Sequence, residues 1–504
     1  MKPWADLLPR PAATATPVGP PAPGARPRPA MLWWGWALAL FAGYVTLSFR
    51  RHALLRTHGY DLGIFEQAVR AYARFEAPLV PLKGPGFNLL GDHFHPILVE
   101  LVPLYWLWPS PLSLLAAQAA LLALAVVPLA RWAYRSTGRA AAHAVAFGYG
   151  ASWGIAQTVA FDFHEVAFAV PLLALGLEAL GRRRWRAAVA WTAPLLLVKE
   201  DLGMTLAAVG AYVALKGPRR LGLCTVAAGM AGSVLQLKVL LPLANSGGRY
   251  DHWERMSGAT APVRDGLLST LVHLPLDLLT PQGKPVLLIL VLAPTAMLAL
   301  RSPLVWLALP TLGWRLASGN SLFWLPDFHY GAVLVPIVFA AFVDALSRWR
   351  GVDHPMARRH IRATLATVVA VTALTVPSFS FGLLLRSATW QTPAHVTAAR
   401  QVLALIPDGA TVAASNRLAP QLTSRCEVVL FPGHPEPGTD SDWIVHDRYA
   451  ADDWPKPTAH WPHPIDEQLK ALAAARRSYD VVAERDGITL LHRRTAPPPT
   501  VDPS

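Results

Sequence analysis

Apolar residues along this chain occur in long runs that are separated by short polar clusters. The first run extends from Met31 to Phe49 and lacks a small-residue cleavage site, which indicates an uncleaved signal anchor. Ten further runs follow, at residues 111–130, 140–161, 166–181, 187–198, 202–215, 221–244, 285–300, 303–316, 331–347 and 361–385. The pattern predicts a mainly α, polytopic membrane helical bundle of about 11 spans over residues 31–385. Several runs are shorter than the ~20 residues of a straight crossing, and the pair 187–198 and 202–215 either crosses twice or re-enters.

Composition supports a membrane protein and argues against a nucleic-acid partner. Hydrophobic residues make up 53% of the chain and charged residues 15%, compared with about 25% charged residues in a typical soluble protein. Lys and Arg exceed Asp and Glu by 13, but the excess lies in short clusters between apolar runs. We therefore expect the lipid bilayer, and not nucleic acid, to be the partner of these basic residues.

The basic clusters also predict an orientation. The segments assigned to the inside hold 20 Lys or Arg and only two acids, Asp6 and Asp353. These segments are the N-terminal tail, 131–139, 182–186, 216–220, Arg301 and 348–362. The positive-inside rule then places the N-terminus in the cytoplasm and the C-terminal region outside. Arg50, Arg51 and Arg56 are exceptions, because they follow the first span on the outer side.

The two ends of the chain differ from the apolar middle. Residues 1–30 are rich in Pro and Ala and are expected to form a disordered cytoplasmic tail, and residues 496–504 form a second Pro-rich tail. Residues 386–495 are expected to form a small extracytoplasmic α/β domain. Its predicted elements are helices at Ala394–Ile406 and Asp466–Arg477, and strands at Ala410–Ala414, Glu427–Phe431, Trp443–Val445, Tyr479–Glu484 and Ile488–His492.

The polar clusters whose side chains could take part in catalysis or binding fall on the predicted outer side. They are Gly59-Tyr60-Asp61, Asp92-His93-Phe94-His95, Asp162-Phe163-His164-Glu165, Lys199-Glu200-Asp201, Tyr250-Asp251-His252-Trp253 and Asp327-Phe328-His329-Tyr330. Ionisable groups at the edge of a membrane are costly, so this one-sided concentration favours a shared functional site. The alternative is that outer loops are simply polar, but the inner loops carry almost only Arg and Lys.

Asp61 opens an amphipathic helix in the first outer loop, residues 50–110. The helix is expected over Asp61 to Glu76, lying on the membrane surface, with Glu66 and Arg70 spaced to form an i,i+4 pair. Asp61 is then either a helix N-cap or a general base that faces a lipid-borne substrate, and the sequence alone leaves both open.

Two further clusters also have two readings. Asp92, His93 and His164 are ligand types that suit a divalent metal such as Mg, Mn or Zn, although their spacing is equally compatible with helix capping or hydrogen bonding. Lys199, with Glu200 and Asp201, either binds a phosphate group or forms a self-neutralising trio at the interface.

The order of these features resembles the GT-C superfamily of integral-membrane glycosyltransferases. The resemblance rests on an Asp that opens an amphipathic helix after the first span, on His95-Pro96-Ile97-Leu98 before the next apolar segment, and on the acidic loop at residues 162–165. The motifs Tyr60-Asp61-Leu62-Gly63-Ile64-Phe65-Glu66-Gln67, Gly91-Asp92-His93-Phe94-His95-Pro96, Asp162-Phe163-His164-Glu165 and Lys199-Glu200-Asp201 are more specifically similar to the bacterial membrane family catalogued as domain of unknown function 2079. The chain differs from typical superfamily members in having Leu62 after Asp61 and Ile97 in place of a second Pro.

The resemblance implies a bacterial plasma-membrane enzyme that takes a sugar from a polyprenyl-phosphate donor at the outer face. In that reading the catalytic residues are Asp61 as the base, with Asp162 and Glu165. The substrate-binding residues are His95, Lys199, Glu200, Asp201, Arg249 and Tyr250, and Lys199 or Arg249 meets the lipid phosphate. A divalent metal would be held near Asp92, His93 and His164.

Two other function classes stay open at this point. A transporter would place its site near the midplane on broken helices within repeats, and the sequence shows no repeat. A non-catalytic scaffold of the cell envelope, acting through the outer domain, is compatible with every sequence feature. The sequence leaves the sugar, the acceptor and the oligomeric state undetermined.

Overall fold

The computed structural model describes residues 30–245, 247–248, 279–350, 355–433, 441–449 and 464–494. The predicted tails, apart from Ala30, lie outside these residues. The cluster at 250–253 and the two predicted binding residues Arg249 and Tyr250 also lie outside them.

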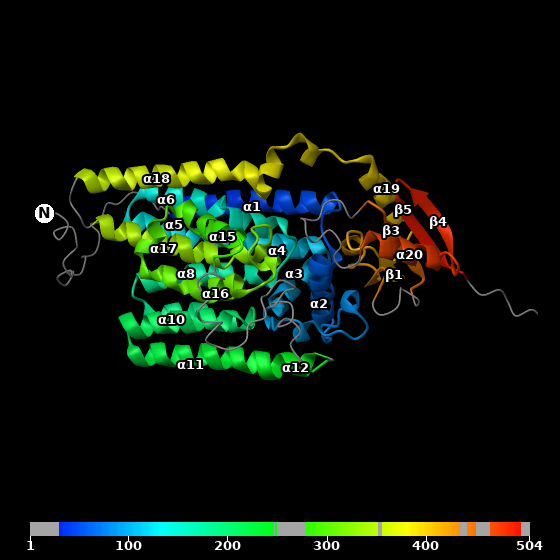
Figure 1. Cartoon of the computed structure of the whole chain (residues 1–504), viewed down its shortest axis with the longest axis horizontal. Coiled ribbons are helices and arrows are strands. Elements are labelled where there is room, and N and C mark those ends of the chain that lie inside the picture. Colours follow the sequence, from blue (N-terminus) through cyan, green and yellow to red (C-terminus); the bar gives the residue numbers. More distant parts are fainter. Residues whose placement is uncertain are drawn as a thin grey trace, which may run out of the picture.

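A bundle of long helices carries a small α/β domain at one of its ends (Figure 1). The bundle helices are α1 (Ala30–Ala53), α4 (Pro111–Leu124), α5 (Val126–Ser136), α6 (Arg139–Gly150), α7 (Trp153–Ala160), α8 (Ala169–Gly181), α9 (Trp185–Thr192), α10 (Leu202–Lys216), α11 (Arg219–Leu235), α12 (Leu241–Ala244), α15 (Gly283–Leu292), α16 (Leu309–Ala317), α17 (Leu334–Arg350) and α18 (Pro355–Thr375). Each predicted apolar run contains helix, and several runs are built from two consecutive helical segments. The mainly α fold with a small C-terminal sheet is therefore confirmed.

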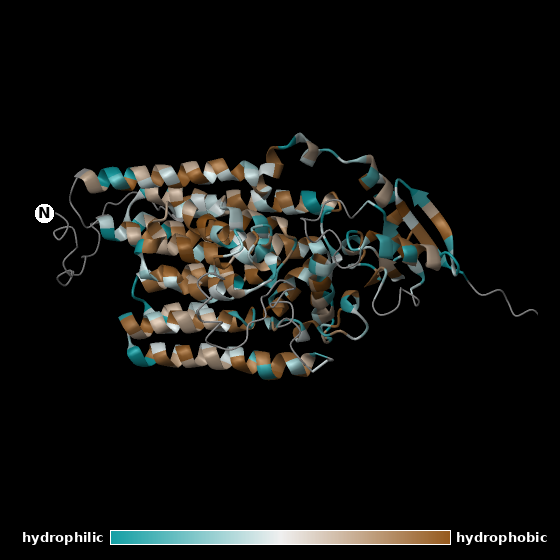
Figure 2. Ribbon diagram, in the orientation of Figure 1, coloured by the Kyte–Doolittle hydropathy of each residue, from teal (hydrophilic) through white to brown (hydrophobic). Residues whose placement is uncertain are grey.

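Within the described part of the chain, five helices are long and apolar enough to cross a membrane by length and composition. They are Met31–Ala53, Pro111–Ser136, Arg219–Ala244, His329–Trp349 and Met356–Ser378. Hydrophobic residues are frequent along the bundle helices, and hydrophilic residues are frequent in the C-terminal domain (Figure 2). The chain is a membrane protein with several helices that are able to span a bilayer.

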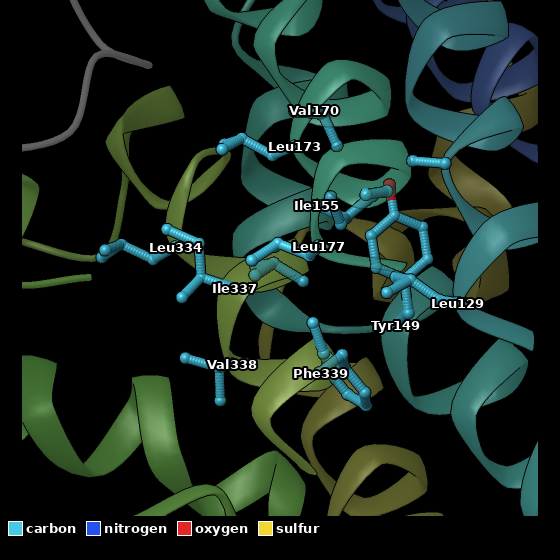
Figure 3. Close-up of a cluster of buried hydrophobic side chains, with 14 of the residues drawn as sticks. Leu129, Tyr149, Ile155, Val170, Leu173, Leu177, Leu334, Ile337, Val338 and Phe339 are labelled. Carbon is cyan, nitrogen blue, oxygen red and sulfur yellow. The ribbon is translucent and has the colours of Figure 1, made fainter. Parts of the chain in front are cut away.

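The centre of the bundle is a continuous apolar core. Tyr149, Leu177 and Phe339 come from α6, α8 and α17 and meet there with other fully buried side chains (Figure 3). The one polar atom of Tyr149 is satisfied, because its hydroxyl donates to the carbonyl of Leu122 at 2.6 Å. Packing of this kind fixes which loops emerge together at each end of the bundle.

The weakest predicted pair of spans forms two helical segments. Residues 185–197 form α9 and a short 3₁₀ segment. Helix α10 follows and packs along α11, and the two helices are joined at one end of the bundle (Figure 1). The end at which α10 meets α11 lies opposite the C-terminal domain (Figure 1). Buried Glu178 of α8 pairs with Arg131, Arg135 and Arg182, so part of the basic excess in the predicted inner segments is neutralised.

The C-terminal domain is a five-stranded sheet with the order β2-β1-β3-β5-β4. Its strands are β1 (Thr411–Ala414), β2 (Glu427–Leu430), β3 (Trp443–Asp447), β4 (Tyr479–Arg485) and β5 (Ile488–Arg493), and its helices are α19 (Ala394–Leu403) and α20 (Ile465–Ala475). Strands β2, β1 and β3 are parallel, and β5 is antiparallel to both β3 and β4. All seven elements agree with the predicted ones to within a few residues, including the closing β4–β5 hairpin.

Helix α2 (Ile64–Ala73) crosses the end of the bundle and connects the two parts of the molecule (Figure 1). Its apolar stripe packs with α3 (Val102–Leu107) and α4. The predicted polar face is not left at a membrane surface, because residues 64–69 are all buried and the C-terminal domain covers this face. The predicted Glu66–Arg70 pair is replaced by two other contacts. Glu66 accepts a hydrogen bond from the Tyr105 hydroxyl, and Arg70 reaches the C-terminal domain.

Arg70 provides a test of this docking. Its Nη1 donates to the carbonyl oxygens of Thr423 at 2.7 Å and Cys426 at 2.8 Å. Hydrogen bonds from a charged donor are worth about 1.5–3 kcal/mol each. We expect Arg70→Met to lower the free energy of unfolding by about 2–4 kcal/mol and to make the C-terminal domain more sensitive to limited proteolysis.

The matched control is Arg74→Met, which removes the same charge from an exposed position one turn further along α2. We expect it to change the stability by less than about 0.5 kcal/mol. Equal proteolysis rates for the two variants would contradict the proposed anchoring role of Arg70.

Candidate functional site

Asp61 lies in a π-helical turn, Gly59–Gly63, that leads into α2. Gly63 is the N-cap of α2, so Asp61 does not fill the capping role that the sequence left open. The Asp61 Oδ1 instead lies 3.3 Å from Nε2 of His164, and its side chain is 20% exposed. Single π-helical turns are frequent at functional sites. The structure therefore holds this carboxylate partly open, against an imidazole from another loop.

The second acidic loop is held in a strained conformation around Asp162. The φ angle of Asp162 is 52°, in the left-handed region that costs energy for a residue with a side chain. Several contacts fix it there. Asp162 Oδ2 accepts from the backbone N of His58 at 2.8 Å and lies 2.9 Å from His58 Nδ1. The Gln118 amide donates to the Asp162 carbonyl and accepts from the backbone N of His164 at 2.9 Å. The loop is therefore rigid before any ligand binds.

Two of the polar clusters, Asp162-Phe163-His164-Glu165 and Asp327-Phe328-His329-Tyr330, meet in space. The rings of His164 and His329 are stacked with centroids 3.6 Å apart, and Phe161 packs against both rings. The stack connects the start of α17 to the Asp61 carboxylate through His164.

A second group of charges lies behind the first. Lys199 Nζ is 3.0 Å from Oε1 of Glu165, and His93 Nδ1 is 2.6 Å from Oε1 of Glu200. Burial alone would raise the pKa of Glu165, but the attraction of Lys199 outweighs it and lowers that pKa to about 2. Burial would lower the pKa of Lys199, yet Glu165 raises it above its ordinary value. This pair is therefore ionised near neutral pH.

Asp201 differs from its neighbours. Burial raises its pKa to about 6, although Lys199 acts in the opposite direction. The indole Nε1 of Trp314 donates to its Oδ2 at 3.1 Å. The trio 199–201 is thus divided among three partners, Glu165, His93 and Trp314, and does not neutralise itself alone.

The three predicted metal ligands have three different partners. Asp92 pairs with Lys83, His93 with Glu200, and His164 with Asp61. The structure does not bring Asp92, His93 and His164 together, because each of them is paired with a different charged residue. His95 is buried beside the ring of Phe65, and this burial lowers its pKa to about 4.

A different set of residues has the geometry of a metal site. His58, Asp61 and Asp162 each offer a ligand atom, and these atoms lie within 4.8 Å of one another. Imidazole and carboxylate ligands suit Zn²⁺ or Mn²⁺. Asp162 Oδ1 is buried without a hydrogen-bond partner among the described residues, so the trio has an oxygen available for a cation. Sequence reasoning missed His58, although it precedes the Gly59-Tyr60-Asp61 cluster directly.

A polar cavity of about 210 Å³ adjoins this trio. Its lining includes His58, Asp327 and three arginines, Arg51, Arg56 and Arg417. In the sequence, Arg51 and Arg56 stand out only as exceptions to the positive-inside rule. That exception was the available signal, because basic residues that break a topology rule need another reason for their position.

Comparisons with solved structures give weak overall similarity. The crystal structure of ArnT from Cupriavidus metallidurans bound to undecaprenyl phosphate is 15% identical, with 92% of this chain and 98% of that chain covered, at a TM-score of 0.49. The Archaeoglobus fulgidus oligosaccharyltransferase tethered to an acceptor peptide is 12% identical, with 91% and 74% covered, at a TM-score of 0.41.

Among curated proteins, no match was found. The model of one protein family, described as "Predicted membrane protein (DUF2079)", matches residues 51–490. That range holds the loops next to the C-terminal domain, the His58–Asp61–Asp162 trio and nearly all of the C-terminal domain. The chain therefore belongs to the DUF2079 family of predicted membrane proteins.

Proposed function

We propose that this protein transfers a glycosyl group from a polyprenyl-phosphate-linked sugar to an acceptor at the outer end of the helix bundle. The observation that carries the proposal is the Asp61 carboxylate, held 3.3 Å from His164 beside the His58–Asp162 pair and an arginine-lined cavity. A general base, a rigid acidic loop and a basic cavity are the parts that such a transfer requires.

In this mechanism Asp61 accepts the proton of the acceptor hydroxyl. The acceptor oxygen forms a bond to the anomeric carbon of the sugar, and the bond between that carbon and the phosphate oxygen breaks. The polyprenyl phosphate leaves with the electron pair. His164, whose Nε2 lies 3.3 Å from Asp61 Oδ1, orients the Asp61 carboxylate before the proton arrives.

The other predicted residues act around this centre. Asp162 holds His58, and Glu165 with Lys199 forms a buried ion pair that fixes the loop carrying His164. His95 and Glu200 are buried and Asp201 is half-buried next to Glu200, so we assign these three residues to shaping the acceptor side of the site. Lys199 is held by Glu165, which makes it a weaker candidate for the lipid phosphate than the arginines of the cavity.

We further propose a divalent cation at His58, Asp61 and Asp162. Such an ion would stabilise negative charge near the reacting phosphate. The chemistry of the three donors and the available Asp162 oxygen support it.

We also propose that the end of the bundle carrying the C-terminal domain faces the outside of a bacterial plasma membrane. The 20 basic residues of the predicted inner segments support this orientation. The scaffold and transporter alternatives receive less support, because the charged groups gather at one end and form a partly open site.

Asp61→Asn tests the base directly. The substitution preserves the volume of a partly exposed side chain, so the protein should remain folded. Transfer to the acceptor should fall by about 10²–10⁴-fold, the typical contribution of a positioned general base. The measurement is glycosyl transfer in membranes supplied with polyprenyl-phosphate-linked sugars. Glu100→Gln, an exposed carboxylate in the same outer loop, is the control and should retain activity. Full transfer by Asp61→Asn would refute the assignment.

The cation makes a separate prediction that does not depend on turnover. Purified protein treated with EDTA should gain thermal stability when Mn²⁺ or Zn²⁺ is added, because a ligand that binds only the folded state stabilises it. Asp162→Asn should reduce this shift strongly, and Glu100→Gln should leave it unchanged. An identical shift in Asp162→Asn would place any cation elsewhere.

The orientation can be checked with reporter fusions. A reporter that is active only in the cytoplasm should stay silent after Ser504 and be active when fused before Met1. The opposite pattern would contradict the orientation and would move the site to the cytoplasmic face.

A further inference from the structure

The arginine-lined cavity lies where the bundle meets the C-terminal domain. Arg51 lies in the last turn of α1 and Arg56 follows this helix, whereas Arg417 follows β1 in the sheet domain. Neither part of the molecule forms this lining alone. The position of Arg417 relative to the two bundle arginines depends on contacts that cross the domain boundary.

The two arginines of the bundle are fixed by a tight turn. Arg51 Nη2 donates to the carbonyl of Arg56 at 3.1 Å, and the backbone N of Arg56 donates to the carbonyl of Arg51 at 2.8 Å. Leu55, between them, has a φ of 57°, which closes the turn. The carboxyl end of a helix also favours nearby cations, so α1 stabilises both guanidinium groups in this position.

Arg417 is placed by its neighbour Asn416. The backbone N of Gly59 donates to the Asn416 carbonyl at 2.6 Å, and the backbone N of Tyr60 donates to Asn416 Oδ1 at 3.0 Å. A Cβ at Gly59 would lie 2.8 Å from the Cβ of Ala419, so the two backbones are in close contact. One loop thus holds the turn that carries Asp61 and presents Arg417 to the cavity.

The charge of the lining suits an anion. The side chains that line the cavity include three guanidinium groups and one carboxylate, that of Asp327. The formal charge of these lining residues is +2 when His58 is neutral. Arginine presents paired N–H donors that match the oxygens of a phosphate group. The cavity is smaller than the roughly 300–1,000 Å³ of a pocket for a whole drug-sized ligand. It therefore fits a head group better than a complete lipid.

We propose that Arg51, Arg56 and Arg417 bind the phosphate or diphosphate group of a ligand, in a site completed by the docked C-terminal domain. The inference rests on the proposed function in one respect, since the ligand would then be the lipid-phosphate donor. It adds that the outer domain is part of the donor site. His58 borders both the cavity and the Asp61 centre, so a phosphate here lies next to the reacting groups.

Binding of undecaprenyl phosphate to the full-length protein in nanodiscs tests this assignment. Arg417→Gln should weaken binding by about 10- to 100-fold, the range expected when one hydrogen-bonded charge contact is lost. Arg417→Lys should lose less, because it keeps the charge without the fork. Arg494→Gln is the control, since it removes an arginine of the same domain whose exposed partner is Asp480.

Two findings would overturn the proposal. One is binding by Arg417→Gln within about twofold of the unsubstituted protein while its melting temperature is unchanged. The other is equal binding of undecaprenol, which lacks the phosphate. If Arg417→Gln unfolds, Arg56→Gln serves as the second variant, with the same expected loss and the same criterion.

Two competitors identify the source of the anion. The competitors are added to protein that holds labelled undecaprenyl phosphate. Displacement of the label by unlabelled undecaprenyl phosphate but not by inorganic pyrophosphate supports a lipid head group. Displacement of the label by both competitors supports a site for free phosphates as well. The readout is also independent of catalysis. Arginine-dependent binding without any glycosyl transfer would refute the proposed function and leave the anion site standing.

Discussion

Buried charge has to be compensated within the protein, and this constraint organises the end of the bundle that carries the C-terminal domain. Three pairs have a carboxylate that is almost fully buried: Glu165 with Lys199, Glu200 with His93, and Asp162 with His58. Removing one partner of such a pair would leave an uncompensated charge at a cost of about 3–5 kcal/mol. Each loop is therefore tied to another loop, and the conformation of the Asp61 turn depends on all of them.

The same constraint explains why the C-terminal domain is more than an attachment. The turn before Asp61 exposes two backbone N–H groups, and Asn416 of the sheet domain accepts a hydrogen bond from each. Gln67 of α2 donates to the carbonyl of Val428, which extends the contact along β2. A helix that would have had a polar face at the membrane surface becomes the buried layer between two domains. The position of the Asp61 turn is consequently coupled to the docking of the C-terminal domain.

Much of the fold could be predicted because its signals are local. Apolar runs of sufficient length identified the bundle, and alternation between turns identified the strands of the sheet domain. Contacts between distant segments could not be predicted in the same way. Asp92, His93 and His164 are plausible ligands by residue type, but their partners Lys83, Glu200 and Asp61 follow only from the packing of the loops. His58, Arg56 and Arg417 carried no distinctive motif, and only the fold brings them to one cavity.

The central claim is that the domain boundary holds a lipid phosphate beside Asp61. The most direct measurement is an experimental structure of the full-length protein in nanodiscs with undecaprenyl phosphate. We expect density for the phosphate among Arg51, Arg56 and Arg417, with the prenyl chain leading into the bilayer. Density for the phosphate at another site, with these three arginines turned away from the ligand, would contradict the claim.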